Sequence, residues 1–98
     1  LIMEQIVIQA NTSGNLKDLI QSAVENQTRI ILSGIARTKR KLQALEKENG
    51  LESRKFYEDF QSGKLGDDFK YIRWAGEYET LVLLQKDYND LQDIELCL

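Results

Sequence analysis

The stretch that decides the fold runs from residue 15 to residue 49 and reads NLKDLIQSAVENQTRIILSGIARTKRKLQALEKEN. It contains no proline and is rich in Leu, Ile, Glu, Lys and Gln, residues that lose little side-chain freedom in a helix. It therefore predicts one uninterrupted helix, roughly 50 Å long at 1.5 Å per residue. A compact chain of this length has a radius of gyration of only about 13 Å. We expect a single elongated helical domain over residues 1–98.

An apolar stripe follows one side of this helix. Ile20, Ile31 and Leu42 are spaced by eleven residues, and so are Val24 and Ile35. Such a repeat gives about 3.67 residues per turn and favours straight packing over a left-handed coiled coil. Because a short chain buries only a modest fraction of its surface, these five residues are the predicted interface of a homodimer or higher homo-oligomer.

Glycines and caps predict the remaining helices. Gly50 is expected to end the first helix in the left-handed conformation. A short helix follows from about Glu52 to Gln61, and a second long helix is expected from a cap at Asp67 or Asp68 to about residue 92. Gly34 lies inside the first helix, where it marks either a weak point or a close approach of another backbone.

Both ends of the chain show the alternation of short strands. Residues 4–10 read EQIVIQA and residues 93–98 read DIELCL, so apolar side chains recur at every second position. Each segment alone would leave its backbone groups unpaired, so we expect the two to pair, within one chain or across a dimer. The predicted fold class is mostly α: a long helix, a short helix and a second long helix, with short N- and C-terminal strands.

Composition argues against several classes of function. The net charge is −3, Cys97 is the single cysteine, and there is no apolar run typical of a membrane protein, so we expect a cytoplasmic chain that binds no membrane. Asp59, Asp67 and Asp68 match no calcium loop. Paired carboxylates would need a buried cleft to act as acid and base. We therefore expect no enzyme, no cofactor and no metal.

One basic run offers an alternative. Within residues 37–41, the side chains of Arg37, Arg40 and Lys41 are expected to share a side of the helix, where they would bind phosphates of a nucleic acid. Such a chain would be a nucleic-acid-binding regulator. A solvated face that pairs with nearby acidic residues is the simpler interpretation, so we do not expect nucleic acid as the partner.

Aromatic residues indicate where a different protein would bind. Phe56 and Phe60 lie one turn apart in the short helix, and Trp74 and Tyr78 lie one turn apart in the last helix. Large aromatic side chains at helix surfaces often anchor protein interfaces. These four residues are the candidate site for a heterologous partner, although a pair such as Trp74 and Tyr78 is most often found in a core or an interface.

The segment from residue 56 to residue 81, FYEDFQSGKLGDDFKYIRWAGEYETL, resembles a group of small uncharacterised prokaryotic proteins. Together with the preceding LEKENGLES it matches their pattern of a helix break, an aromatic-glycine turn and an acidic-aromatic helix, at Gly50, Phe56, Phe60, Gly63, Leu65, Gly66, Asp67 and Trp74. Asn49 stands where the group often has tyrosine. The group resembles the antitoxin half of toxin-antitoxin modules, which implies a chain that masks a toxin protein and has no catalytic residue. We therefore predict a non-enzymatic, homo-oligomeric protein-interaction module.

Overall fold

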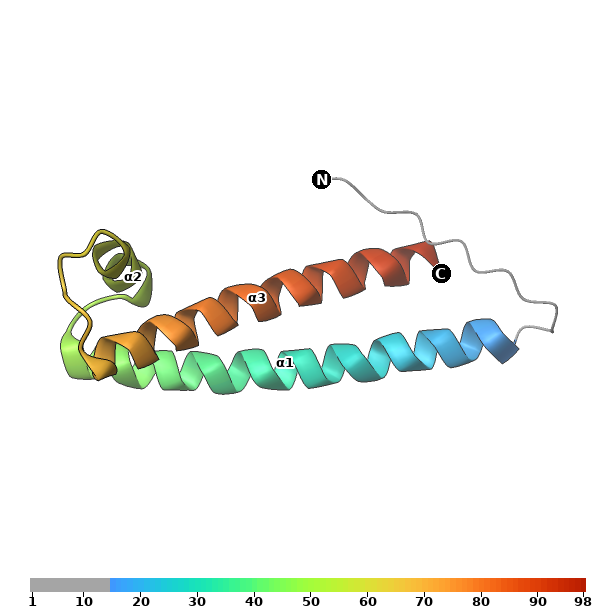
Figure 1. Cartoon of the computed structure of the whole chain (residues 1–98). Helices are drawn as coiled ribbons and strands as arrows, with labels where there is room; N and C mark the ends of the chain where they lie inside the picture. The colour runs from blue at the N-terminus through green and yellow to red at the C-terminus, as the bar shows by residue number, and fades with distance from the viewer. Residues whose placement is uncertain (1–14) are drawn as a thin grey trace.

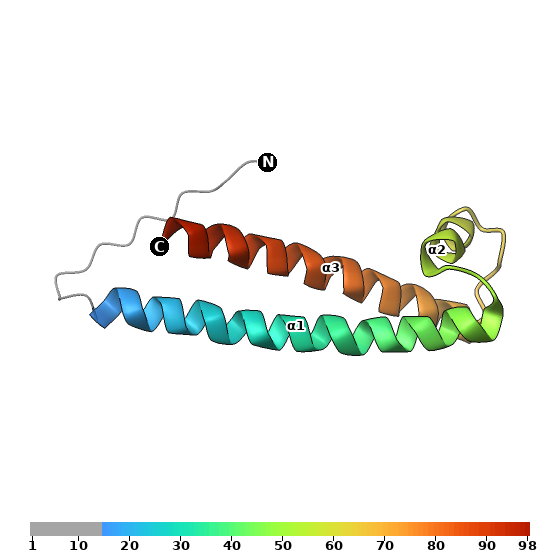
Figure 2. The ribbon, with the colours of Figure 1, turned by 180° about the vertical axis from the view of Figure 1, so that it is seen from behind.

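The computed structural model describes residues 15–98, which form three α-helices: α1 (Asn15–Asn49), α2 (Ser53–Gln61) and α3 (Phe69–Cys97). The two long helices lie antiparallel as a hairpin, and α2 with its connections closes one end (Figures 1 and 2). The molecule is 57 Å long with a radius of gyration of 18.4 Å, well above the roughly 13 Å of a compact chain. The predicted bounds of the first helix are confirmed.

The helix ends follow the predicted cap chemistry. Gly50 has a φ of 63°, and the N–H groups of Gly50 and Leu51 both donate to the Glu46 carbonyl, at 2.8 and 3.3 Å. These bonds satisfy a carbonyl that the helix itself leaves free. At the start of α3, the Asp68 carboxylate accepts the Lys70 N–H at 3.1 Å. Of the two aspartates proposed as caps, Asp68 is the N-cap.

The predicted C-terminal strand is wrong, because α3 continues to Cys97 instead of ending near residue 92. The alternation in residues 93–98 coexists with Leu91, Ile94 and Leu98 at helical spacing, and no glycine or proline interrupts it. Continuing the helix satisfies the backbone within the segment, whereas a lone strand would not. The other expected strand, residues 4–10, lies outside the described residues.

Two contacts set the register of the hairpin and divide it into halves. Gly34 lies beside the Leu84 side chain, and the Lys41 ammonium lies 3.6 Å from the Glu77 carboxylate. Both pairs place residue 36 of α1 level with residue 82 of α3. We call residues 37–80 the loop half, which contains α2, and residues 15–36 with 81–98 the open half.

The hydrophobic core is confined almost entirely to the loop half. Leu42, Phe56, Trp74 and Ala75 form it, and Leu45, Phe60 and Tyr78 pack around it. In the open half, Ile31 is the one buried hydrophobic residue within the described range. Most of the exposed large apolar side chains within residues 15–98 belong to the open half, while Phe69 and Ile72 of the loop half are exposed as well. Those of the open half are Leu19, Ile30, Leu32, Val82, Leu83 and Leu96. No helix within residues 15–98 is long and apolar enough to cross a membrane.

Candidate interaction surfaces

A hydrogen-bonded junction fixes α2 to both long helices. The Phe56 ring stacks on the Trp74 indole with centroids 3.9 Å apart and planes 5° apart. The indole Nε1 donates to the Ser53 hydroxyl at 3.0 Å. The backbone N–H of Ser53 donates to Glu46 Oε2 at 2.7 Å. Because Glu52 makes no side-chain cap, a carboxylate of α1 caps α2, and Trp74 of α3 holds its first residue.

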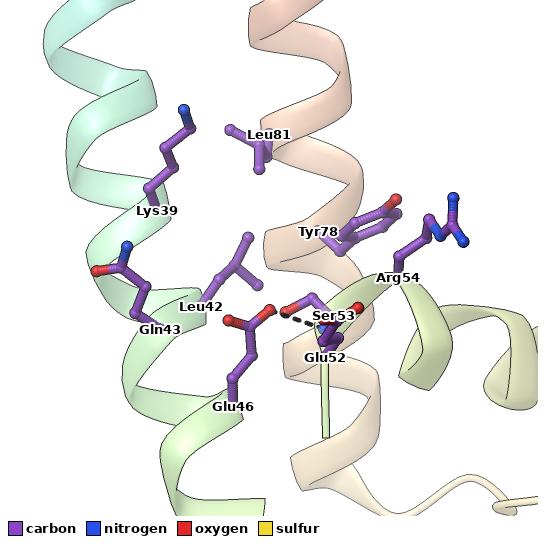
Figure 3. A pocket seen from close by; sticks show the side chains of 9 residues that line it. All are labelled: Lys39, Leu42, Gln43, Glu46, Glu52, Ser53, Arg54, Tyr78 and Leu81. Atoms are coloured by element: carbon purple, nitrogen blue, oxygen red, sulfur yellow. Dashed lines mark hydrogen bonds between the residues drawn. The ribbon is translucent and has the colours of Figure 1, made fainter. Parts of the chain in front are cut away.

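A pocket of about 350 Å³ opens beside this junction (Figure 3). Leu42, Tyr78 and Leu81 supply its apolar walls, while its polar lining includes two cations and two carboxylates, Lys39, Arg54, Glu46 and Glu52. In Figure 3 the Glu46 carboxylate reaches towards Ser53. Among residues 15–98, no three His, Cys, Asp or Glu side chains are grouped to hold a metal. We regard this pocket as part of the packing between three helices.

The four aromatic residues expected to bind a partner divide into two kinds. Phe56 and Trp74 are 0 % and 1 % exposed, so they belong to the core and present no surface in this conformation. Phe60 and Tyr78 are half-buried. Phe60 stacks on Phe56 at 5.8 Å, and Tyr78 lies 4.9 Å from the Tyr57 ring. A partner at this end would therefore meet Phe60 and Tyr78.

The predicted oligomer stripe lies on the side of α1 that packs within the hairpin. Ile31 and Leu42 are buried, whereas Ile20, Val24 and Ile35 are half-buried. Leu42 belongs to the same core as Trp74 and Ala75 of α3. The chain's own second long helix thus uses much of this stripe, and a partner needs other apolar residues.

A second apolar stripe on α1 escaped the sequence analysis. Leu19 is 66 % exposed and Ile30 is 56 % exposed. They are eleven residues apart and so share one side of the helix. Arg37 and Lys41 continue that side into the loop half, seven and eleven residues after Ile30. The signal was present in the sequence, because this stripe has the same spacing as the one that was identified.

The Lys41 side of α1 borders a groove of about 430 Å³ against the start of α3. Its lining residues are Lys41, Ala44, Leu45 and Glu48 of α1, with Lys70, Arg73 and Glu77 of α3. Along α3, a spacing of seven continues from Lys70 and Glu77 to the half-buried Leu84, Leu91 and Leu98. We call this side of the hairpin, from Leu19 and Leu98 to the groove, the groove face.

The helix α2 lies on the opposite side of the hairpin. Where α2 packs, the α1 residues beside it are Lys39, Gln43 and Glu46, whereas Lys41, Ala44 and Glu48 line the groove. These two sets lie on opposite sides of one helix. The groove face is therefore free of α2 along its whole length.

The basic residues of the nucleic-acid alternative are all exposed, but they do not act as one cluster. Lys41 lines the groove and pairs with Glu77, and Arg37 lies one turn before it on the same side. Arg40 is not part of the groove lining. Lys70 and Arg73 of α3, which the sequence analysis did not associate with this run, join Lys41 there.

Comparisons with family models, with curated proteins and with solved structures found no match to this chain. The resemblance to antitoxins therefore stays a prediction.

Proposed function

We propose that this chain is a non-enzymatic protein-interaction module that assembles with a second copy of itself through the groove face. The main support for the proposal is that the loop half buries a hydrophobic core, whereas the open half leaves several large apolar side chains exposed. Two helices in one layer must cover their apolar sides with another layer. In the loop half α2 is that layer on one side, but in the open half Leu19 and Ile30 remain exposed.

A second copy of the chain is the simplest partner that would bury these exposed side chains. Helical hairpins that pack face to face form four-helix bundles, and each then buries the side that its own helices cannot cover. Burial of one Leu or Ile side chain contributes about 1.5–3 kcal/mol. The stripe of Leu19 and Ile30, with Leu84, Leu91 and Leu98 across from it, offers several such side chains in each copy.

The resemblance to antitoxins adds a further proposal, that the assembled protein masks a toxin-like protein. Phe60 and Tyr78 are the predicted partner-binding residues with accessible surface. Binding to this end would leave the groove face available for assembly, because the pocket lined by Tyr78 lies on the α2 side.

One observation favours nucleic acid as a second candidate. The groove brings Lys70 and Arg73 next to Lys41, which makes a wider basic surface than the run on α1 alone. This candidate predicts that DNA or RNA migrates more slowly with the protein at low salt, and that raised salt or the K41Q,R73Q variant abolishes the shift. Unretarded migration at low salt would exclude it.

Sedimentation velocity on the wild type, I30E and L32E tests self-assembly. Ile30 and Leu32 are both exposed, at 56 % and 45 %, but they lie on different sides of α1. We expect a dimer at micromolar concentration for the wild type and for L32E, and a monomer for I30E. A buried unpaired charge at the interface costs several kcal/mol.

Thermal unfolding at several protein concentrations provides the second readout. If assembly stabilises the fold, the Tm of the wild type and of L32E rises with concentration, and the Tm of I30E does not. A wild type that sediments as a monomer with a concentration-independent Tm would contradict the proposal. An I30E variant that dimerises as tightly as L32E would move the interface away from the groove face.

A further inference from the structure

We infer, on the basis of the proposed self-assembly, that the two copies lie antiparallel and overlap along their full length. The open half of each copy then covers the groove of the other. Three properties of the groove face support this arrangement: its area, the charges of the two halves, and the residues that line the groove.

The area of the face favours a full overlap. The molecule measures 57 Å by 24 Å across its broad side. Half of that side covers on the order of 700 Å², slightly below the roughly 800 Å² that each partner buries in a standard interface, whereas the full side exceeds it. Two open halves packed only on each other would therefore form a small interface.

The charges favour the antiparallel direction. The open half carries three basic and six acidic side chains, and the loop half carries ten basic and nine acidic ones. A parallel full overlap would place the two acidic halves together, and like charges in contact are costly. An antiparallel overlap instead places each acidic half on a loop half whose groove presents Lys41, Lys70 and Arg73.

The groove offers matching contacts for the open half of a second copy. Its lining combines Ala44 and Leu45 with cations, and Glu48 and Glu77 are its acidic members. The end of the open half is likewise apolar and charged: Leu98 continues the spacing of seven along α3, Glu95 lies about one turn before it, and Leu19 lies on the groove side of α1. In a full antiparallel overlap, the apolar side chains meet Ala44 and Leu45, and Glu95 comes level with the Lys41–Glu77 pair of the second copy.

Energy transfer between labelled copies tests the direction. Cys97 is the single cysteine and is exposed, so it takes a label at the open end. The K64C,C97S variant takes a label at the loop end. We expect strong transfer from a donor on Cys97 of one copy to an acceptor on the K64C,C97S copy, and weak transfer between two copies labelled at the loop end.

Each outcome has a distinct meaning. Strong transfer between two K64C,C97S copies, with weak transfer in the mixed pair, shows a parallel dimer and overturns the inference while the proposed self-assembly stands. Weak transfer in both pairs from a protein that sediments as a monomer overturns both. Strong transfer in the mixed pair alone supports the antiparallel overlap.

Charge reversal at the groove tests the contact itself. We expect K41E to weaken dimerisation about tenfold, a change that corresponds to about 1.4 kcal/mol, because it removes the cation that faces the acidic half. K39E is the matched control, since Lys39 lies on the α2 side of the same helix. Adding E95K to K41E should restore most of the affinity. Equal effects of K41E and K39E would overturn the inferred contact.

Discussion

In the loop half, α1 and α3 pack together with α2 around the stacked rings of Phe56 and Trp74, whereas in the open half the same two helices, within residues 15–98, pack only on each other. The difference does not come from a shortage of apolar residues, because Leu19, Ile30 and Leu83 of the open half are all large. It comes from the lack, among the described helices, of a third one beside the open half. In the loop half, the nine-residue helix α2 packs on the two long helices and completes a hydrophobic core.

The comparison also separates stability from assembly. Residues of the loop half are expected to determine whether the chain folds, and exposed residues of the open half are expected to determine whether copies associate. Substitutions in the loop half should therefore change the free energy of unfolding, and substitutions in the open half should change the association of copies.

The largest expected effect is that of F56A. Phe56 is fully buried and stacks on Trp74, so its removal leaves a cavity in the small core and should lower the free energy of unfolding by about 3–5 kcal/mol. L83A, at a site 61 % exposed in the open half, is the control and should change it by less than about 0.5 kcal/mol. Urea denaturation followed by circular dichroism measures both. Equal losses would mean that the halves do not differ in stability.

The second effect concerns the junction at Ser53. S53A removes the hydroxyl that accepts the Trp74 indole N–H, and leaves that donor buried without its acceptor, at a cost of about 1–3 kcal/mol. S62A is a matched control, because Ser62 is exposed at the other end of α2 and its hydroxyl donates to the Asp59 carbonyl. If urea denaturation finds the two variants equally stable, the junction does not hold α2 in place.

The ends of the first helix and the start of the last helix were predictable because they depend on local chemistry, whereas the cap of α2 comes from Glu46 of α1 and was not predicted. The first helix, the turn at Gly50 and a cap at Asp67 or Asp68 each follow from residues adjacent in sequence, and the structure selects Asp68. The prediction of a C-terminal strand was wrong because the local pattern there is ambiguous. Its alternation is compatible with helix as well as strand, and the uninterrupted turns before residue 93 decide in favour of helix.

The surfaces were harder to predict. The spacing of apolar residues shows that a side chain packs against another surface, but it does not identify that surface. Ile31 and Leu42 were expected to face a second copy, yet they are buried in the single chain. Phe56 and Trp74 were candidates for binding a partner, and packing against α2 places them in the core of the single chain. Arg73 joins Lys41 only through the hairpin register, which depends on contacts between residues far apart in sequence.

A smaller effect compares the two glycines inside helices. G76A should stabilise the protein by about 0.5–1 kcal/mol, because alanine is the better helix former and the added Cβ meets no atom within 4 Å. In G34A the Cβ would lie 3.3 Å from a Leu84 methyl, so repacking should offset part of the gain. The contact at Gly34 is with a side chain rather than with the backbone that the sequence analysis considered. Thermal unfolding should give G76A a higher Tm than G34A. The reverse order would contradict the close approach of Leu84 to Gly34.

The smallest effect concerns Tyr57 at high pH. Its hydroxyl donates to the Glu79 carboxylate at 2.6 Å, and this bond, followed by partial desolvation, raises the pKa of Tyr57 above its ordinary value of about 10. Because the folded state holds the proton more tightly than the unfolded state, the contribution to stability is complete below pH 10 and decreases as the pH rises through the raised pKa. The wild type should therefore lose more stability above pH 10 than Y57F, whose side chain cannot ionise. Denaturation at pH 8 and pH 11 measures this difference, and E79Q should reduce it by removing the charged acceptor. If the wild type and Y57F lose equal stability over that interval, the link between α2 and α3 through Tyr57 makes no contribution that depends on ionisation.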